Sequence, residues 1–318
     1  MKIKKNIYLI SGIILMLGIV VYSCYSFYSE RFSYAKNYYE IKENCYEEKD
    51  IDNVLCNSFK YQGKIDRQSL EEYILNSNPQ KVRKNLDVAT VTSEIVESSF
   101  FSKLQMFSPL IIIFIVIGSV HASFISGEFK NHIMREEYKN YLKKQYMIAP
   151  KVALVMPCSL ILIFIFACLF TNFNFDTSSV SSNMAVYESW KYNNFILYGI
   201  IICFIQFFIS LLYAHIAMIC IRKNKNKLVA IVMGYIVFIV VYLFIYLVIY
   251  VLIVNKLLGF KELTDYFNIT GYWFFNTGPK FIWVVLLSFI FQLISFVYLY
   301  VVYNKKEKLV VNYEKQVS

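Results

Sequence analysis

The chain has 318 residues, of which 58% are apolar and only 17% are charged, and its formal net charge is +10 at pH 7. An ordinary water-soluble domain carries roughly a quarter charged residues, and the mean hydropathy here is +0.48. This composition excludes a typical water-soluble protein and predicts a protein embedded in a membrane.

Long apolar stretches are the main structural signal. A helix needs about 20 apolar residues to cross a hydrocarbon layer of about 30 Å. Because lipid offers the backbone no hydrogen-bond partners and no strand-like alternation is present, we predict an all-α integral membrane protein with six transmembrane helices. The stretches without Asp, Glu, Lys or Arg are Ile7–Phe27, Met106–Ser126, Val152–Phe170, Phe195–Ile221, Leu228–Val254 and Phe281–Tyr303.

Basic residues predict the orientation, because Lys and Arg in short loops stay on the cytoplasmic side. Seventeen of them lie in the N-terminal tail, the segments 127–151 and 222–227, and the C-terminal tail, whereas the opposite short loops hold only four. Both termini are therefore expected in the cytoplasm, with the chain in the cell membrane as a multi-pass protein. The net charge follows from this asymmetry and requires no nucleic-acid partner.

The first apolar stretch has an alternative interpretation as a cleaved leader. Basic residues precede it, and Val21-Tyr22-Ser23-Cys24 loosely resembles a lipoprotein cleavage box. Tyr22 fits that box badly, and cleavage would leave five spans with an extracellular N-terminus. An uncleaved first span is preferred, and a mature protein that begins at Cys24 would overturn this preference.

Residues 28–105 are predicted to form an extracellular lobe, since they contain eleven basic and thirteen acidic residues. They follow the N-terminal tail and first span (1–27) and precede the remaining spans (106–318). A short helix is expected over Arg67–Leu75. Cys45 and Cys56 both lie in the lobe, where an oxidising exterior permits a disulfide, the alternative being two unpaired thiols.

The segment between the second and third spans is predicted to form an amphipathic cytoplasmic helix at about 128–146. Met134, Tyr138, Tyr141 and Leu142 recur at i, i+4, i+7 and i+8, which gives one apolar stripe on an otherwise charged helix. Such a helix lies on the lipid surface or fills a groove on a partner. Pro150 is expected to break it before the third span.

Catalytic and metal-binding motifs are missing from the sequence. No phosphate-binding loop occurs, no Cys pair has zinc spacing, and the three histidines are scattered. The spans carry no acids, which disfavours a proton-driven carrier but leaves carbonyl-based sodium sites open. If the protein transports, its energy is expected to arrive from another subunit. The candidate polar residues of a transport pathway are Gln206 and Gln292. Only ten glycines are present, which limits the expected helix pairing through small-residue motifs.

Six spans, a lobe after the first span and a cytoplasmic helix between the second and third resemble the permease subunits of type 2 ATP-binding-cassette exporters. Gly127-Glu128, the helix over 129–144 and Ala149-Pro150-Lys151 are similar to that family's order of glutamate, charged helix, proline and lysine. Two departures stand beside them, because Asn131-His132 replaces a glycine-threonine step and the arginine expected after the proline is absent.

The resemblance implies a homodimer, or a heterodimer with a related permease, in the lipid bilayer and coupled to a separate ATPase subunit that uses ATP. It also implies that Glu128, Met134, Tyr138, Tyr141 and Leu142 belong to the helix that docks on that ATPase, while the spans move cargo outward by alternating access. No catalytic residue, metal or cofactor is expected in this chain. The alternative is a non-transporting immunity or sensor protein whose lobe binds a ligand.

Overall fold

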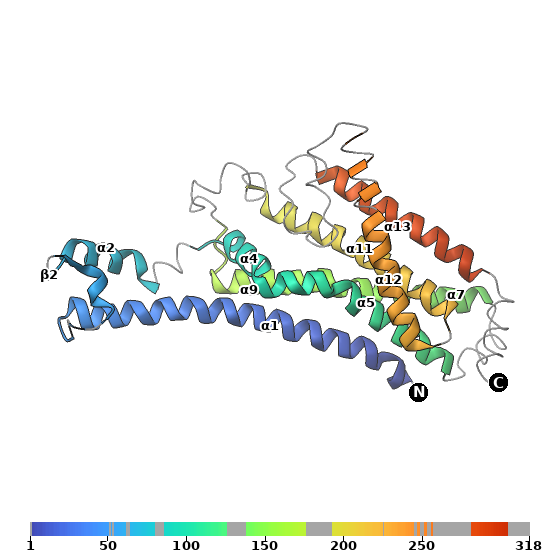
Figure 1. The fold of residues 1–318 in the computed structure, drawn as a ribbon, viewed down its shortest axis with the longest axis horizontal. Coiled ribbons are helices and arrows are strands. Elements are labelled where there is room, and N and C mark those ends of the chain that lie inside the picture. Colours follow the sequence, from blue (N-terminus) through green and yellow to red (C-terminus); the bar gives the residue numbers. More distant parts are fainter. Residues whose placement is uncertain are drawn as a thin grey trace. The chain divides into compact units, whose positions relative to one another are not determined.

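The computed structural model is mostly helical, and its contacts divide the chain into two units (Figure 1). Unit 1 comprises Met1–Ile19, Ser99–Ile161 and Tyr187–Ser318, and unit 2 comprises Val20–Ser98 and Leu162–Val186. The residues that the structure describes are 2–50, 52, 54–61, 64–79, 86–125, 138–175, 193–224, 226–244, 247–248, 251–252, 256 and 281–304.

Unit 1 is built around α11 (Phe195–Lys223), which packs against α5, α8, α12 and α13. This helix is apolar on all sides, as expected for a helix enclosed by other helices or by lipid. Leu212, Ile216 and Cys220 of α11 form a buried cluster with Val237 and Phe291. The other helices are α5 (Ser99–Ile125), α7 (Tyr138–Tyr146), α8 (Ile148–Ala153), α12 (Lys227–Leu243) and α13 (Phe281–Tyr303), with the starts of α1 (Lys2–Ile41) and α9 (Val155–Phe170).

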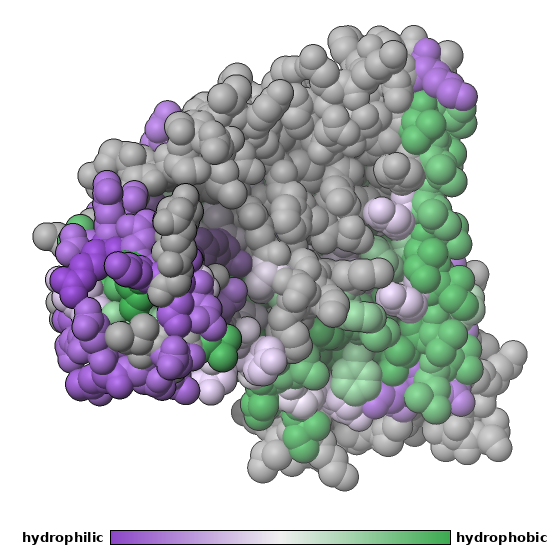
Figure 2. All heavy atoms as spheres, turned by 60° about the vertical axis from the view of Figure 1, so that its left-hand side comes forward, coloured by the Kyte–Doolittle hydropathy of each residue, from purple (hydrophilic) through white to green (hydrophobic). Residues whose placement is uncertain are grey.

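Three helical stretches of the described chain are long and apolar enough to cross a membrane, namely Ile7–Tyr46, Asn140–Phe170 and Phe195–Lys223. They indicate a membrane protein. Shorter apolar helices are Phe107–Ala122, Lys227–Leu243 and Ser288–Tyr303. Each of the six predicted stretches thus contains a helix, while six crossings remain a prediction. Figure 2 shows apolar side chains covering one part of the described surface and hydrophilic side chains gathered on another.

Unit 2 holds most of the predicted lobe, and it contains a small β-hairpin that the all-α prediction did not include. Strands β1 (Lys60–Tyr61) and β2 (Lys64–Ile65) pair antiparallel, with Lys60 opposite Ile65. The predicted short helix is present as α2. Asp66 stabilises its N-terminus by accepting a hydrogen bond from the Gln68 N–H. The elements of the lobe are η1 (Lys42–Tyr46), η2 (Cys56–Phe59), β1, β2, α2 (Arg67–Ser77) and α4 (Val88–Glu97).

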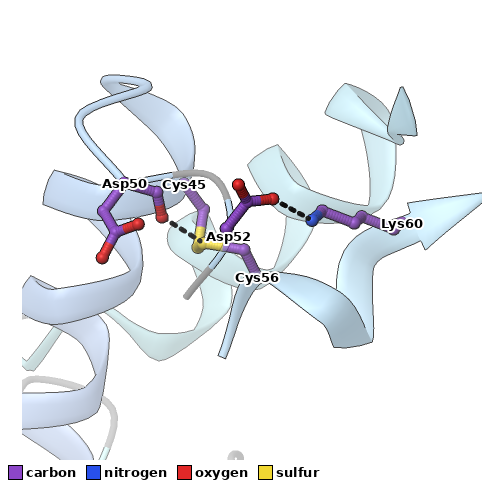
Figure 3. Close-up of a disulfide and its surroundings, with 5 residues drawn as sticks. All are labelled: Cys45, Asp50, Asp52, Cys56 and Lys60. Carbon is purple, nitrogen blue, oxygen red and sulfur yellow. Dashed lines mark hydrogen bonds and ion pairs between the residues drawn. A yellow bond between two sulfur atoms is a disulfide. The ribbon is translucent and has the colours of Figure 1, made fainter. Parts of the chain in front are cut away.

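The lobe has its own small core around a disulfide. Cys45 and Cys56, the candidate pair, are joined by a disulfide with their Cα atoms 5.4 Å apart (Figure 3). Both cysteines are fully buried and pack with Ile41 and Leu70. Exposed ion pairs lie around this core, such as Lys60 with Asp52. The bridge therefore ties the segment after α1 to the hairpin and α2.

Single glycines let α5 approach its neighbours closely in unit 1. A Cβ atom on Gly118 would overlap the ring of Tyr8 in α1, and one on Gly12 would overlap the side chain of Ile115. A Cβ atom on Gly234 of α12 would come within 2.9 Å of Ile113 Cγ2. Small-residue packing of this kind is typical of membrane helices. These are isolated glycines and not small-residue motifs, so the expectation that scarce glycine limits pairing through such motifs stays a prediction.

Replacing Gly118 by Ala is expected to destabilise the protein by about 1–3 kcal/mol, because the added methyl group forces the Tyr8 ring to move. Thermal unfolding in detergent measures the change. Gly199→Ala is the matched control, since no atom of the described part of the chain lies within 4 Å of a Cβ atom at that position. Stability of Gly118→Ala equal to that of Gly199→Ala would contradict the tight packing of α1 on α5.

Candidate functional site

Aromatic and cationic side chains gather where α7 meets the C-terminal ends of α11 and α13. Tyr138, Tyr141 and Tyr146 come from α7, Arg222 comes from the last turn of α11, and Tyr303 is the last residue of α13. We call these five residues the tyrosine–arginine cluster. All of them belong to unit 1.

Tyr303 is the centre of the cluster and is only 1% exposed. Its hydroxyl donates a hydrogen bond to the Met218 carbonyl of α11 at 2.8 Å. Its own carbonyl is one of the last four of α13, which have no partner within the helix, and it accepts a hydrogen bond from the Tyr138 hydroxyl. Tyr138 therefore caps α13, and Tyr303 joins α13 to α11.

Arg222 places a buried cation beside these tyrosines. Its guanidinium carbon lies 5.2 Å from the centre of the Tyr303 ring, within the range of a cation–π interaction. The guanidinium also hydrogen-bonds to the Tyr138 side chain. A positive charge is favourable at the C-terminus of a helix, and the ring and hydroxyl compensate part of the desolvation cost.

The Tyr138 hydroxyl keeps its proton at neutral pH. Burial raises the pKa of Tyr138 above its ordinary value, although the neighbouring Arg222 guanidinium acts in the opposite direction. A protonated hydroxyl can accept from Arg222 and donate to the Tyr303 carbonyl at the same time. The side chain thus links α7 to both α11 and α13.

The described residues of the predicted apolar stripe, Tyr138, Tyr141 and Leu142, lie against other parts of the chain. Tyr141 is 2% exposed and Leu142 is 6% exposed, and the Tyr138 and Tyr141 rings stack with their centres 6.2 Å apart. Glu128 and Met134 lie outside the described residues. Docking of the stripe on an ATPase stays a prediction, and what the structure shows is that these side chains hold α7 against unit 1.

A second cationic contact involves the start of α12. The Lys227 ammonium donates a hydrogen bond to the Tyr8 hydroxyl at 2.9 Å and lies 4.2 Å from the centre of the Tyr8 ring. The Phe114 ring is 5.3 Å from the same ammonium. Only a short turn separates Lys227 from Arg222, so the starts of α1 and α12, the ends of α11 and α13, and α7 lie at the same end of unit 1.

Comparison with known proteins gives no relative. No family model, no curated protein and no solved structure matches the chain.

The two candidate pathway residues lie on neighbouring helices but are not hydrogen-bonded to each other. Gln206 of α11 is 2% exposed, and neither its amide nitrogen nor its amide oxygen has a hydrogen-bond partner among the residues that the structure describes. Gln292 of α13 is half-buried, and its carbonyl accepts a hydrogen bond from Ser295. Ser295 Oγ also lies 2.8 Å from Nδ1 of His215, which is buried.

Sequence reasoning missed the role of Arg222 and Tyr303. From the sequence, Arg222 was interpreted only as one of the cytoplasmic basic residues, and Tyr303 only as the last residue of the sixth predicted span. The sequence offers only a weak signal for their contact: Arg222 follows a long apolar run directly, and Tyr303 ends another such run later in the chain. Among the residues that the structure describes, no group of three or more His, Cys, Asp or Glu is placed to hold a metal ion.

Proposed function

We propose that the chain is the permease subunit of an exporter of the type 2 ATP-binding-cassette class, driven by a separate ATPase subunit. The observation that carries this proposal is the attachment of α7 to the C-terminal ends of α11 and α13 through Tyr138, Arg222 and Tyr303. A displacement of α7 would be passed directly to two apolar helices. That arrangement suits a helix that is moved by a subunit outside the membrane and transmits the movement to the membrane helices.

The proposal includes six spans with both termini in the cytoplasm of a cell-membrane protein. The contact of Lys227 with Tyr8 and that of Tyr138 with Tyr303 support it, because they bring together the segments whose basic residues predict a cytoplasmic position. Dimerisation with a second permease, and ATP hydrolysis by the partner, follow from the same resemblance. Gln206, an amide buried without a partner, supports a polar point on an otherwise apolar route.

Within this proposal the cytoplasmic segment has two parts. Glu128 and Met134 belong to the part that contacts the ATPase, and Tyr138, Tyr141 and Leu142 belong to the part that transmits the movement. The substrate is an amphipathic or hydrophobic molecule that leaves the cell, with peptides and drugs as the classes to try first.

Co-purification in mild detergent tests the proposal. We expect the full-length chain, expressed in its native host, to retain an ATP-binding-cassette ATPase whose hydrolysis rises in its presence. Tyr138→Phe should leave the ATPase bound but lower the stimulation by at least about five-fold, because it removes both hydrogen bonds of the hydroxyl and a single hydrogen bond of roughly 1 kcal/mol already corresponds to that factor. Tyr300→Phe is the control, since Tyr300 is exposed on the same helix as Tyr303.

The alternative function is a membrane-bound immunity or sensor protein. The disulfide-linked core of the lobe favours it, because a separate folded module outside the membrane is suited to ligand binding. Recovery of the chain without any ATPase, from cells in which the neighbouring genes encode none, would favour this second function over the first.

A further inference from the structure

Helix α7 runs beside the last two turns of α13. Tyr138 bonds to the carbonyl of Tyr303, and the Tyr146 ring lies 5.9 Å from the rings of both Tyr303 and Phe296. Phe296 and Tyr303 are about 10 Å apart along the axis of α13 at 1.5 Å per residue. Since α13 is apolar up to Tyr303, α7 lies at the level where the hydrocarbon of a bilayer gives way to its headgroups.

A second contact, between α11 and α13, independently places this end of unit 1 at the boundary between hydrocarbon and headgroups. The Lys223 ammonium donates a hydrogen bond to the Tyr298 hydroxyl at 3.1 Å, and both side chains are accessible. Tyrosine hydroxyls and lysine ammonium groups concentrate at the interface between hydrocarbon and water. The end of unit 1 that holds α7 is therefore an interfacial region.

The outward side of α7 is basic. Asn140, Lys143 and Lys144 are exposed, whereas Tyr141 and Leu142 on the other side are buried. Lys151, at the entry of the following apolar helix, is also exposed. No Asp or Glu occurs between residues 138 and 151. The outward face of α7 is thus a positive surface at the depth of the membrane interface. The apolar face of the same helix is buried within the protein.

We propose that Lys143 and Lys144 bind the phosphates of anionic lipid headgroups, so that the charge of the leaflet holds α7 at the membrane surface. The charge complementarity is direct, because anionic leaflets attract lysines within a Debye length of the surface. The site rests on the six-span topology of the proposed function, although it requires no ATPase and no substrate.

Hydrogen–deuterium exchange of the full chain in nanodiscs tests this site. The discs contain phosphatidylcholine alone or phosphatidylcholine with phosphatidylglycerol. We expect the amides of α7 to exchange about 25-fold more slowly with phosphatidylglycerol, which is the combined effect of two lysine–surface attractions of about five-fold each, and we expect high salt to remove the difference. Lys143→Gln/Lys144→Gln should abolish the difference, while Lys143→Arg/Lys144→Arg should retain it.

Lys36→Gln/Lys64→Gln is the matched control, because it removes two exposed lysines from unit 2. This variant should behave as the wild type. Equal exchange of α7 in the two kinds of disc would overturn the proposal and leave an acidic protein surface as the partner of α7. Protection by inorganic phosphate in phosphatidylcholine discs would also overturn it, since that result indicates a site for a soluble anion.

Discussion

Replacing Tyr303 by Ala is expected to lower the free energy of unfolding by about 3–5 kcal/mol, the range for removal of a buried aromatic side chain. The side chain is almost fully buried, and its ring contacts Arg222 and Tyr146. Truncation leaves a cavity at the junction of α7, α11 and α13 and removes the hydrogen bond to Met218. Denaturant titration of the purified protein in detergent measures the loss.

Two further variants separate the parts of this effect. Tyr303→Phe keeps the ring under Arg222 and removes only the hydroxyl, so we expect a loss of about 1 kcal/mol. Tyr300→Ala removes a tyrosine that is 49% exposed on the same helix and should cost much less. Equal losses for Tyr303→Ala and Tyr300→Ala would show that Tyr303 does not hold the junction together.

Replacing Cys45 by Ser is expected to destabilise the lobe by about 3 kcal/mol, because the bridge closes a loop of about a dozen residues in the unfolded chain. The core around the bridge is small, and modules of this size commonly depend on disulfides. Limited proteolysis and amide exchange of α2 measure the effect. We expect α2 to become accessible to protease while the helices of unit 1 remain protected.

Cys158→Ser is the control for this experiment, since Cys158 is exposed and takes no part in a disulfide. A reductant added to the wild-type protein should reproduce the behaviour of Cys45→Ser. If the lobe of Cys45→Ser resists protease as well as the wild type does, the remaining contacts of Leu70 and Ile41 are sufficient and the predicted dependence on the bridge is wrong.

The helices were predictable because the signal is local. An uncharged run as long as Phe195–Ile221 leaves few alternatives to a helix, and α11 begins at the same residue as this run and ends two residues after it. The cap of α2 is also a local signal, since Asp66 lies directly before the helix. The Cys45–Cys56 pairing was open to prediction because no other cysteine lies in the lobe.

The direction of the α7 stripe was not predictable in this way. Spacing shows that Tyr138, Tyr141 and Leu142 share one side of a helix, but it does not show which surface that side meets. The partners are Arg222 and Tyr303, which lie far along the chain, so only tertiary packing decides. The close approach of Gly118 to Tyr8 was not predictable either, because an isolated glycine forms no sequence pattern that identifies the residue it contacts.

The Cys45–Cys56 bridge has a consequence for the order of biogenesis. Disulfides form and persist in oxidising compartments, so on the proposed topology the lobe can close only after its segment has crossed the membrane. Insertion of α1 therefore precedes maturation of the lobe, and a chain inserted in the opposite orientation would keep both thiols reduced. The redox state of this one pair would then report, molecule by molecule, whether the newly made protein has entered the membrane the right way round.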